Sequence, residues 1–99
     1  MTIEKKKFSD SELLVKPIGR IDVNLAPELE KEINEEIDTI SYLTIDLDEV
    51  NYISSIGLRV FLAIQKKLAG RGEMKITNIK PEVLEIFKMV GFDKILNII

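Results

Sequence analysis

The spacing of hydrophobic and polar residues changes several times along the chain, which predicts a succession of strands and helices. Residues 3–8 and 13–21 each have the pattern of a strand, and the polar residues 9–12 between them are typical of a turn that returns the chain antiparallel. Pro17 cannot donate a ladder hydrogen bond, so we expect an edge, a bulge or a break in the second strand.

A helical period begins after Asn24. Apolar residues recur there every four positions, at Leu25, Leu29, Ile33 and Ile37. Asn24 is expected to cap this helix, and Pro27 is tolerated in its first turn, where the backbone amides lack partners inside the helix. The glutamates on the other faces predict a side that is exposed to solvent.

The remainder of the chain alternates between strands and helices with short connections. Strands are predicted at residues 42–47 and 73–77, helices at 55–69 and 81–90, a turn at 48–52, and a short closing helix or turn at 92–99. Gly70-Arg71-Gly72 is expected to end one helix and to turn the chain into the next strand. Phe92, Ile95 and Ile98 are expected to pack onto the core.

This order of elements predicts the α/β class, with residues 1–99 forming a single domain. We expect a mixed sheet of about four strands, the first antiparallel and the later ones parallel, with about four helices. In such sheets ligands and partners bind beyond the carboxyl ends of the strands. The functional site is therefore expected where a strand leads into a helix.

Composition narrows the functions that this domain can have. The chain has 99 residues, 45% of them hydrophobic, and a formal net charge of -3 from 14 basic and 17 acidic residues. No basic block is present that could follow a phosphate backbone, so no nucleic-acid partner is predicted. The sequence has no unbroken apolar run long enough for direct membrane insertion, and a cytoplasmic location is expected.

Cysteine and histidine are both absent from the sequence. Disulfides, thiolate nucleophiles, imidazole bases and the ligands of most zinc sites are thereby excluded. No cofactor, metal or catalytic residue is predicted.

Two adjacent serines, Ser54 and Ser55, stand between a strand-like run and a helix-like run. A hydroxyl at a helix start lies beside unpaired backbone amides, which favour an anion such as a phosphate. From spacing alone, simple N-capping by one of the two serines is the favoured interpretation, and a phosphorylation switch is the alternative.

Asp46 and Asp48 are two residues apart at a strand end, as in a magnesium-binding acidic pair. A metal-dependent receiver that accepts a phosphoryl group on aspartate is therefore a further hypothesis. No third acidic ligand is evident, so the pattern favours carboxylates that serve a turn or a cap.

Several motifs together resemble one known family. They are Ile18-Gly19-Arg20-Ile21-Asp22, Leu43-Thr44-Ile45-Asp46-Leu47, Tyr52-Ile53-Ser54-Ser55-Ile56-Gly57-Leu58, Lys80-Pro81-Glu82-Val83 with Phe87, and Gly91-Phe92-Asp93-Lys94-Ile95. In this order they resemble the anti-sigma factor antagonist family, the STAS domain, over nearly the whole chain.

The resemblance implies that Ser55, two positions before the glycine, accepts a phosphoryl group. Many members have an aspartate before the acceptor and a small residue after it, where this chain has Ser54 and Ile56. The implied function is partner switching. The unphosphorylated protein binds an anti-sigma factor that is itself a serine kinase, and a sigma factor is released. Phosphorylation ends this binding, a serine phosphatase restores it, and the chain has no catalysis of its own.

The partner surface implied around Ser55 is made of Asp22, Val23, Asn24, Ser54, Ile56 and Arg59. Ile56 and Arg59 are expected to be the most exposed residues of the following helix. A core-facing stripe is predicted on the same helix at Gly57, Val60, Phe61, Ile64 and Leu68. The alternative function is a STAS module that is never phosphorylated and serves as a scaffold or as an accessory of a transport or signalling complex.

Overall fold

The computed structural model describes residues 3–99, so the first two residues of the predicted domain lie outside the described residues. The main sheet is built from β1 (Ile3–Lys7), β2 (Glu12–Pro17), β4 (Tyr42–Asp46), β6 (Glu73–Thr77) and β7 (Asn97–Ile98), in the spatial order β1-β2-β4-β6-β7. The first pair is antiparallel and the later pairs are parallel, which confirms that part of the prediction.

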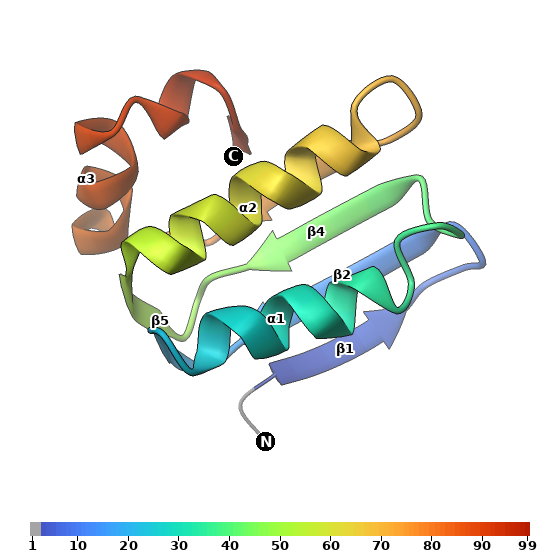
Figure 1. The fold of residues 1–99 in the computed structure, drawn as a ribbon, viewed down its shortest axis with the longest axis horizontal. Helices are drawn as coiled ribbons and strands as arrows, with labels where there is room; N and C mark the ends of the chain where they lie inside the picture. The colour runs from blue at the N-terminus through green and yellow to red at the C-terminus, as the bar shows by residue number, and fades with distance from the viewer. Residues whose placement is uncertain (1–2) are drawn as a thin grey trace.

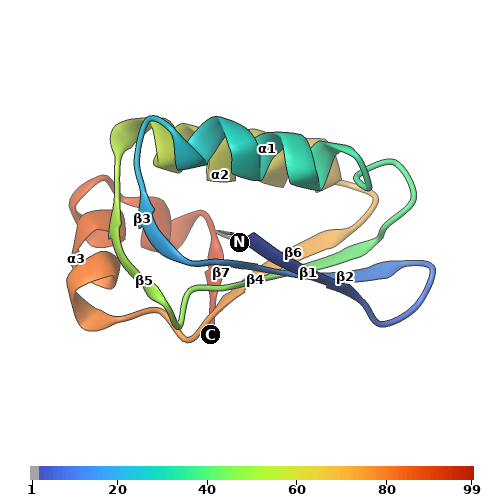
Figure 2. The same ribbon diagram turned by 90° about the horizontal axis from the view of Figure 1, so that it is seen from below.

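Helices α1 (Leu25–Asn34) and α2 (Ser55–Leu68) lie side by side on one face of this sheet (Figures 1 and 2). The third helix, α3 (Pro81–Met89), packs against the end of the molecule where the strands lead into α1 and α2. Within residues 3–99 these are the only α-helices, so the expectation of about four helices is wrong. None of them has the length and apolar character needed to cross a membrane.

A small second sheet pairs β3 (Gly19–Ile21) with β5 (Val50–Ile53) in parallel. The predicted second strand breaks after Pro17, and Gly19 has a φ of +102°, which lets the chain leave the main sheet. Figure 2 shows both short strands rising from the level of the main sheet to the first turns of the two helices. The prediction of a turn at residues 48–52 is therefore wrong, because residues 50–52 belong to β5.

The closing segment also differs from its prediction. Phe92–Lys94 forms one 3-10 turn, η1, and the chain then adds β7 beside β6. Phe92 and Ile98 pack against the core as predicted, but Ile95 is 52% exposed. Leu96 takes the buried position instead, because β7 sets the direction of the last side chains.

The hydrophobic core lies between the main sheet and the helices. The residues predicted as the core-facing stripe of α2 are all buried, and Phe61 meets Phe87 of α3 edge to face at 5.8 Å between ring centroids. Among the described residues no polar or charged residue is buried. The core is therefore held by apolar packing, and polar contacts are confined to the surface and the turns.

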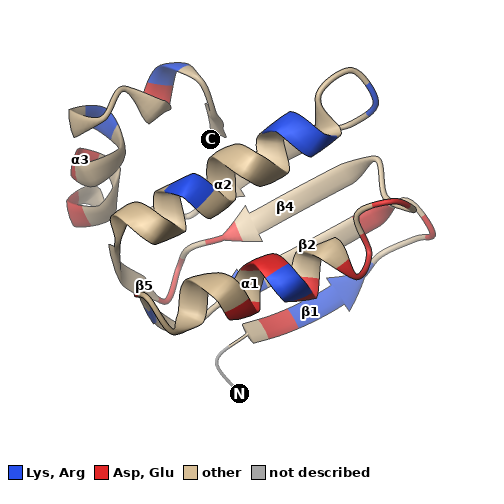
Figure 3. Cartoon of the chain, in the orientation of Figure 1, with Lys and Arg blue, Asp and Glu red and all other residues tan. Residues whose placement is uncertain are grey.

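Charged side chains link the outer elements around this core. Lys5 of β1 lies 3.0 Å from Glu32 and 3.5 Å from Glu35, at the acidic side of α1 (Figure 3). Arg71, which follows α2, donates to the backbone oxygens of Ile37 at 2.6 Å and Ile40 at 3.4 Å. The turn after α1 is thereby tied to the turn after α2.

Gly57 is the point where α2 approaches the small sheet most closely. A Cβ atom at this position would lie 2.7 Å from Cγ1 of Ile53 and 2.8 Å from Cγ2 of Ile21. Both isoleucines are almost fully buried, so neither can move aside freely. The first turn of α2 sits against the ends of β3 and β5 because residue 57 has no side chain.

This close approach predicts the effect of a minimal substitution. Gly57→Ala is expected to lower the free energy of unfolding by about 1 kcal/mol or more, because overpacking outweighs the better helix propensity of alanine. Denaturation in urea measures the change. Lys66→Ala, at an exposed position of the same helix, is the control and should stay within about 0.5 kcal/mol of wild type. A Gly57→Ala protein as stable as wild type would contradict the close contact.

Candidate functional site

The candidate site lies where the two short parallel strands end. The backbone N–H of Ser54, after β5, donates to the carbonyl oxygen of Ile21, the last residue of β3, at 2.8 Å. This bond holds the residue before α2 next to the loop before α1. The structure therefore brings together the two segments from which the sequence predicted a partner surface.

Ser54 is the N-cap of α2. Its backbone is extended, with φ -85° and ψ 170°, and its hydroxyl oxygen accepts a hydrogen bond from the N–H of Gly57 at 3.2 Å. Its carbonyl oxygen accepts from the N–H of Leu58 at 3.0 Å, the first bond of the helix. The predicted N-capping by one of the two serines is confirmed, and Ser54 is the serine that caps.

Ser55 is the first residue of α2 and is exposed. Within residues 3–99 its hydroxyl group makes no hydrogen bond to the chain. Ser54 already accepts a hydrogen bond from a backbone amide of the first turn that has no partner inside the helix, so the Ser55 hydroxyl is not needed as a cap. The two serines thus differ in exposure and in bonding, and only the second presents a free nucleophile to solvent.

The loop before α1 is ordered by a carboxylate that the sequence did not identify as a cap. Oδ1 of Asp22 accepts from the backbone N–H of Asn24 at 3.0 Å and from that of Leu25 at 2.9 Å. Asn24 occupies the N-cap position, but its side chain makes no capping bond, so that prediction is wrong. The N–H groups of Leu25 and Asn24 hold the pKa of the Asp22 carboxyl below its ordinary value of 3.8.

Exposure varies among the remaining residues of the predicted surface. Val23 is 60% exposed, and Asn24 and Arg59 are also exposed. Ile56 is only partly exposed, because its side chain packs against the core. Besides Ser55, the exposed residues of the predicted surface are therefore one valine, one asparagine and one arginine.

Sequence reasoning missed one contact beside this site. The guanidinium of Arg20 lies 4.2 Å from the ring centroid of Tyr52, a cation–π contact between β3 and β5. The two residues are far apart in the chain, and the pairing of their strands was not predicted. No local signal in the sequence would have revealed it.

Asp46 and Asp48 lie at the turn that follows β4. Oδ1 of Asp46 accepts from the backbone N–H of Asp48 at 2.9 Å and from the side-chain amide of Asn78 at 3.2 Å, as in a turn. In the part of the chain that the structure describes, no three acidic, histidine or cysteine residues gather as ligands. The interpretation of these aspartates as turn carboxylates fits the geometry.

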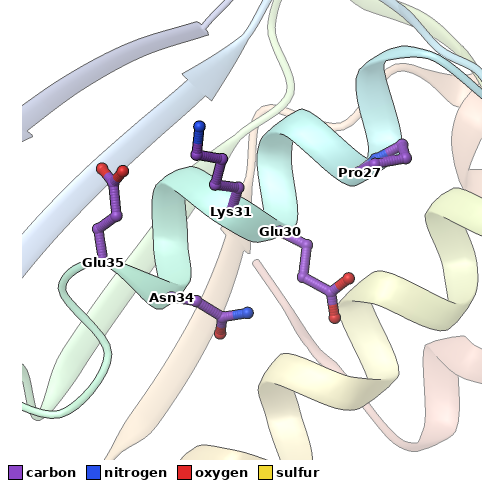
Figure 4. Close-up of a pocket in the computed structure, with 5 residues that line it drawn as sticks. All are labelled: Pro27, Glu30, Lys31, Asn34 and Glu35. Atoms are coloured by element: carbon purple, nitrogen blue, oxygen red, sulfur yellow. The ribbon is translucent and has the colours of Figure 1, made fainter.

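Two surface depressions lie on or beside α1. The depression drawn in Figure 4 is lined by residues of α1 and its C-cap, Pro27, Glu30, Lys31, Asn34 and Glu35, and these side chains spread outward along the helix without converging. Another depression lies beside the candidate site, with Arg20, Asp22 and Glu28 at its wall. Neither has the apolar enclosure that is typical of small-molecule sites.

A matched pair of substitutions tests whether the two serine hydroxyls contribute differently to stability. Ser54→Ala removes the cap of α2 and is expected to lower the free energy of unfolding by about 1 kcal/mol. Ser55→Ala removes a hydroxyl without a partner and is expected to change it by less than about 0.5 kcal/mol. Urea denaturation at neutral pH measures both. Equal losses for the two variants would contradict this division of roles.

The depressed pKa of Asp22 predicts how its contribution to stability depends on pH. A carboxyl whose pKa is lower in the folded protein stabilises the fold at pH values above 3.8, and this contribution is lost as pH falls through the folded pKa. Asp22→Ala is therefore expected to have a lower urea midpoint than wild type at pH 7. The difference should shrink below pH 4, approximately the ordinary aspartate pKa. A difference that is the same at pH 7 and at pH 3 would contradict the role of the charged carboxylate.

The sequence of this chain is similar to those of several known proteins. The BtrV protein of Bordetella bronchiseptica is 37% identical over 76 residues, which are 75% of this chain and 66% of that protein. The anti-sigma-B factor antagonist of Bacillus subtilis is 29% identical over 93 residues, which are 93% of this chain and 85% of that protein.

A solved structure supports the same fold. The anti-sigma factor antagonist SpoIIAA in its unphosphorylated form superposes with a TM-score of 0.86 at 15% identity, covering 98% of this chain and 87% of that chain. At this low identity the likeness shows the fold alone. Residues 3–99 match the STAS domain family, and the chain belongs to that family.

Proposed function

We propose that this chain is an anti-sigma factor antagonist, whose unphosphorylated form binds an anti-sigma factor and so releases a sigma factor. Membership of the STAS family and a relative named anti-sigma-B factor antagonist support the proposal. The observation that carries it is the exposed Ser55 hydroxyl, which is free of the capping bond made by Ser54. A group in this position can be modified without dismantling the helix start.

Phosphorylation of Ser55 is the proposed off-switch, and the partner anti-sigma factor is the proposed serine kinase. The Ser55 oxygen attacks the γ-phosphorus of ATP, the bond to the bridging oxygen breaks, ADP leaves, and a base of the kinase takes the hydroxyl proton. A serine phosphatase returns the hydroxyl by hydrolysis. The chain itself is a binder and a substrate, without catalysis of its own.

The proposed partner surface consists of Asp22, Val23, Asn24, Ser54, Ile56 and Arg59 around Ser55. Exposed Val23 supplies apolar area, and the exposed groups of Asn24 and Arg59 supply hydrogen bonds. The bond between Ser54 and Ile21 keeps the two contributing loops in a fixed relation. Little ordering of the surface is therefore needed when a partner binds.

Electrostatics explain how a single phosphate can end the binding. A phosphoserine at position 55 changes the formal net charge from -3 to about -5. At the first position of a helix the dianion is favoured by the free amides, so the fold is expected to survive. A dianion that must lose its water against an acidic or apolar partner surface weakens the complex.

The proposal predicts that Ser55→Asp keeps the fold and loses the partner. Proteins retained by the wild type in a pull-down identify the anti-sigma factor, and calorimetry with the purified partner then gives the affinities. Ser55→Asp is expected to weaken binding at least about tenfold, which is about 1.4 kcal/mol. Its thermal midpoint should stay within about 2 °C of wild type.

Ser55→Ala is the matched control. It removes the phosphate acceptor without adding charge, so it should bind as wild type and gain no phosphate from the partner and ATP. Binding by Ser55→Asp as strong as by wild type would overturn the switch and would favour a STAS scaffold or accessory module that is not regulated by phosphorylation.

A further inference from the structure

Arg59 is placed to interact with any group attached to Ser55. The two residues are separated by four positions on α2, both are exposed, and side chains four apart on a helix have Cβ atoms about 5 to 6 Å apart. The residue three positions after Ser55 is Leu58, which is buried. On the exposed side of this helix, Arg59 is thus the neighbour one turn beyond the candidate phosphorylation site.

The guanidinium group of Arg59 has no bonded partner among the described residues. Within residues 3–99 it takes part in no ion pair, hydrogen bond or ring contact. The other arginines differ in this respect, since Arg20 stacks on Tyr52 and Arg71 donates to backbone oxygens of the turn after α1. Figure 3 shows positive charge in the N-terminal half of α2.

We infer that Arg59 binds the phosphoryl group of phosphorylated Ser55 within the same chain, so that one modification both adds a dianion and withdraws a cation from the partner surface. This inference rests on the proposed function for the modification of Ser55. It goes beyond that function by naming the residue that receives the phosphate and the second effect of the switch.

The chemistry of the two groups matches. Guanidinium presents parallel N–H donors that fit two phosphate oxygens, and charge-assisted bonds of this kind are stronger than those between neutral groups. The order of the charges along the helix is also favourable, because the anion lies nearer the N-terminus and the cation nearer the C-terminus. Side chains four positions apart on a helix lie close enough to form such a pair.

The consequence concerns the partner surface. In the unphosphorylated protein the Arg59 guanidinium is free to meet an acidic group of the partner. After phosphorylation it is held by the phosphate, so the surface loses its exposed cation as well as gaining negative charge. The loss of the cation and the gain of the phosphate charge both make the surface more negative, and both therefore weaken binding to a partner whose contact surface is acidic.

The test uses the second ionisation of the phosphate as a probe of its neighbours. Full-length protein with phosphoserine installed at position 55 by genetic encoding is titrated while its phosphorus NMR signal is followed. A nearby guanidinium stabilises the dianion, so the pKa of this ionisation is expected to be about 0.15 to 0.4 unit lower in wild type than in Arg59→Gln. The difference should vanish at about 1 M salt, because a surface pair is then screened.

Controls separate a local pair from a general effect of charge. Lys66→Gln removes an exposed cation about 16 Å from Ser55 along the axis of the same helix. This distance exceeds the screening length in physiological salt, so the pKa of the phosphate should stay as in wild type. Arg59→Lys should restore part of the shift. Neighbouring charges such as Asp22 and Arg20, and all charged residues other than the one replaced, are the same in every variant, so they cancel in the difference.

Equal phosphate pKa values in wild type and Arg59→Gln would overturn the inference, as would an equal shift in Lys66→Gln. Because the phosphate is installed without a kinase, this result does not depend on whether a kinase modifies Ser55. Failure of the proposed function would show separately, as undiminished partner binding by Ser55→Asp. Circular dichroism confirms that each variant is folded, as expected for changes at exposed positions.

Discussion

The close contact between Gly57 and the isoleucines at the ends of β3 and β5 is the constraint on which the site depends. It lets the first turn of α2 rest against two short strands that leave the plane of the main sheet. A strand pair this small is not stable alone, so its packing against the helix holds it in place. The bond from Ser54 to Ile21 then joins the helix start to the loop before α1.

Neighbouring residues at this site differ in whether they bond to the backbone. Asp22 and Ser54 satisfy backbone amides at the starts of α1 and α2, and both are therefore part of the fold. Ser55, Val23 and Arg59 take no part in these bonds and remain exposed. Exposed groups that make none of these bonds, next to backbone held by them, fit the proposed surface, which binds one partner and is altered by a single modification.

The sequence predicted those parts of the fold that depend on local pattern. The periods of α1 and α2 and of the strands β4 and β6 are strong and that of β1 is weak, and the boundaries of all five elements agree within a few residues with the structure. The short strands β5 and β7 were missed, and β3 was predicted as part of the strand at residues 13–21, because each has only two to four residues and pairs with a distant segment. Such pairing comes from tertiary packing and leaves no period in the sequence.

The site shows the same division between local and non-local information. Capping by Ser54 follows from its place between a strand and a helix and was predictable, whereas Asn24 was wrongly chosen over Asp22 because both residue types cap helices and stand two positions apart. The backbone decides between them, since Asn24 already has helical dihedral angles of -90° and -44° and only the carboxylate two residues earlier can reach the free amides. The geometry of a loop, more than the identity of its residues, therefore determines which side chains hold this surface together and which are left free to bind.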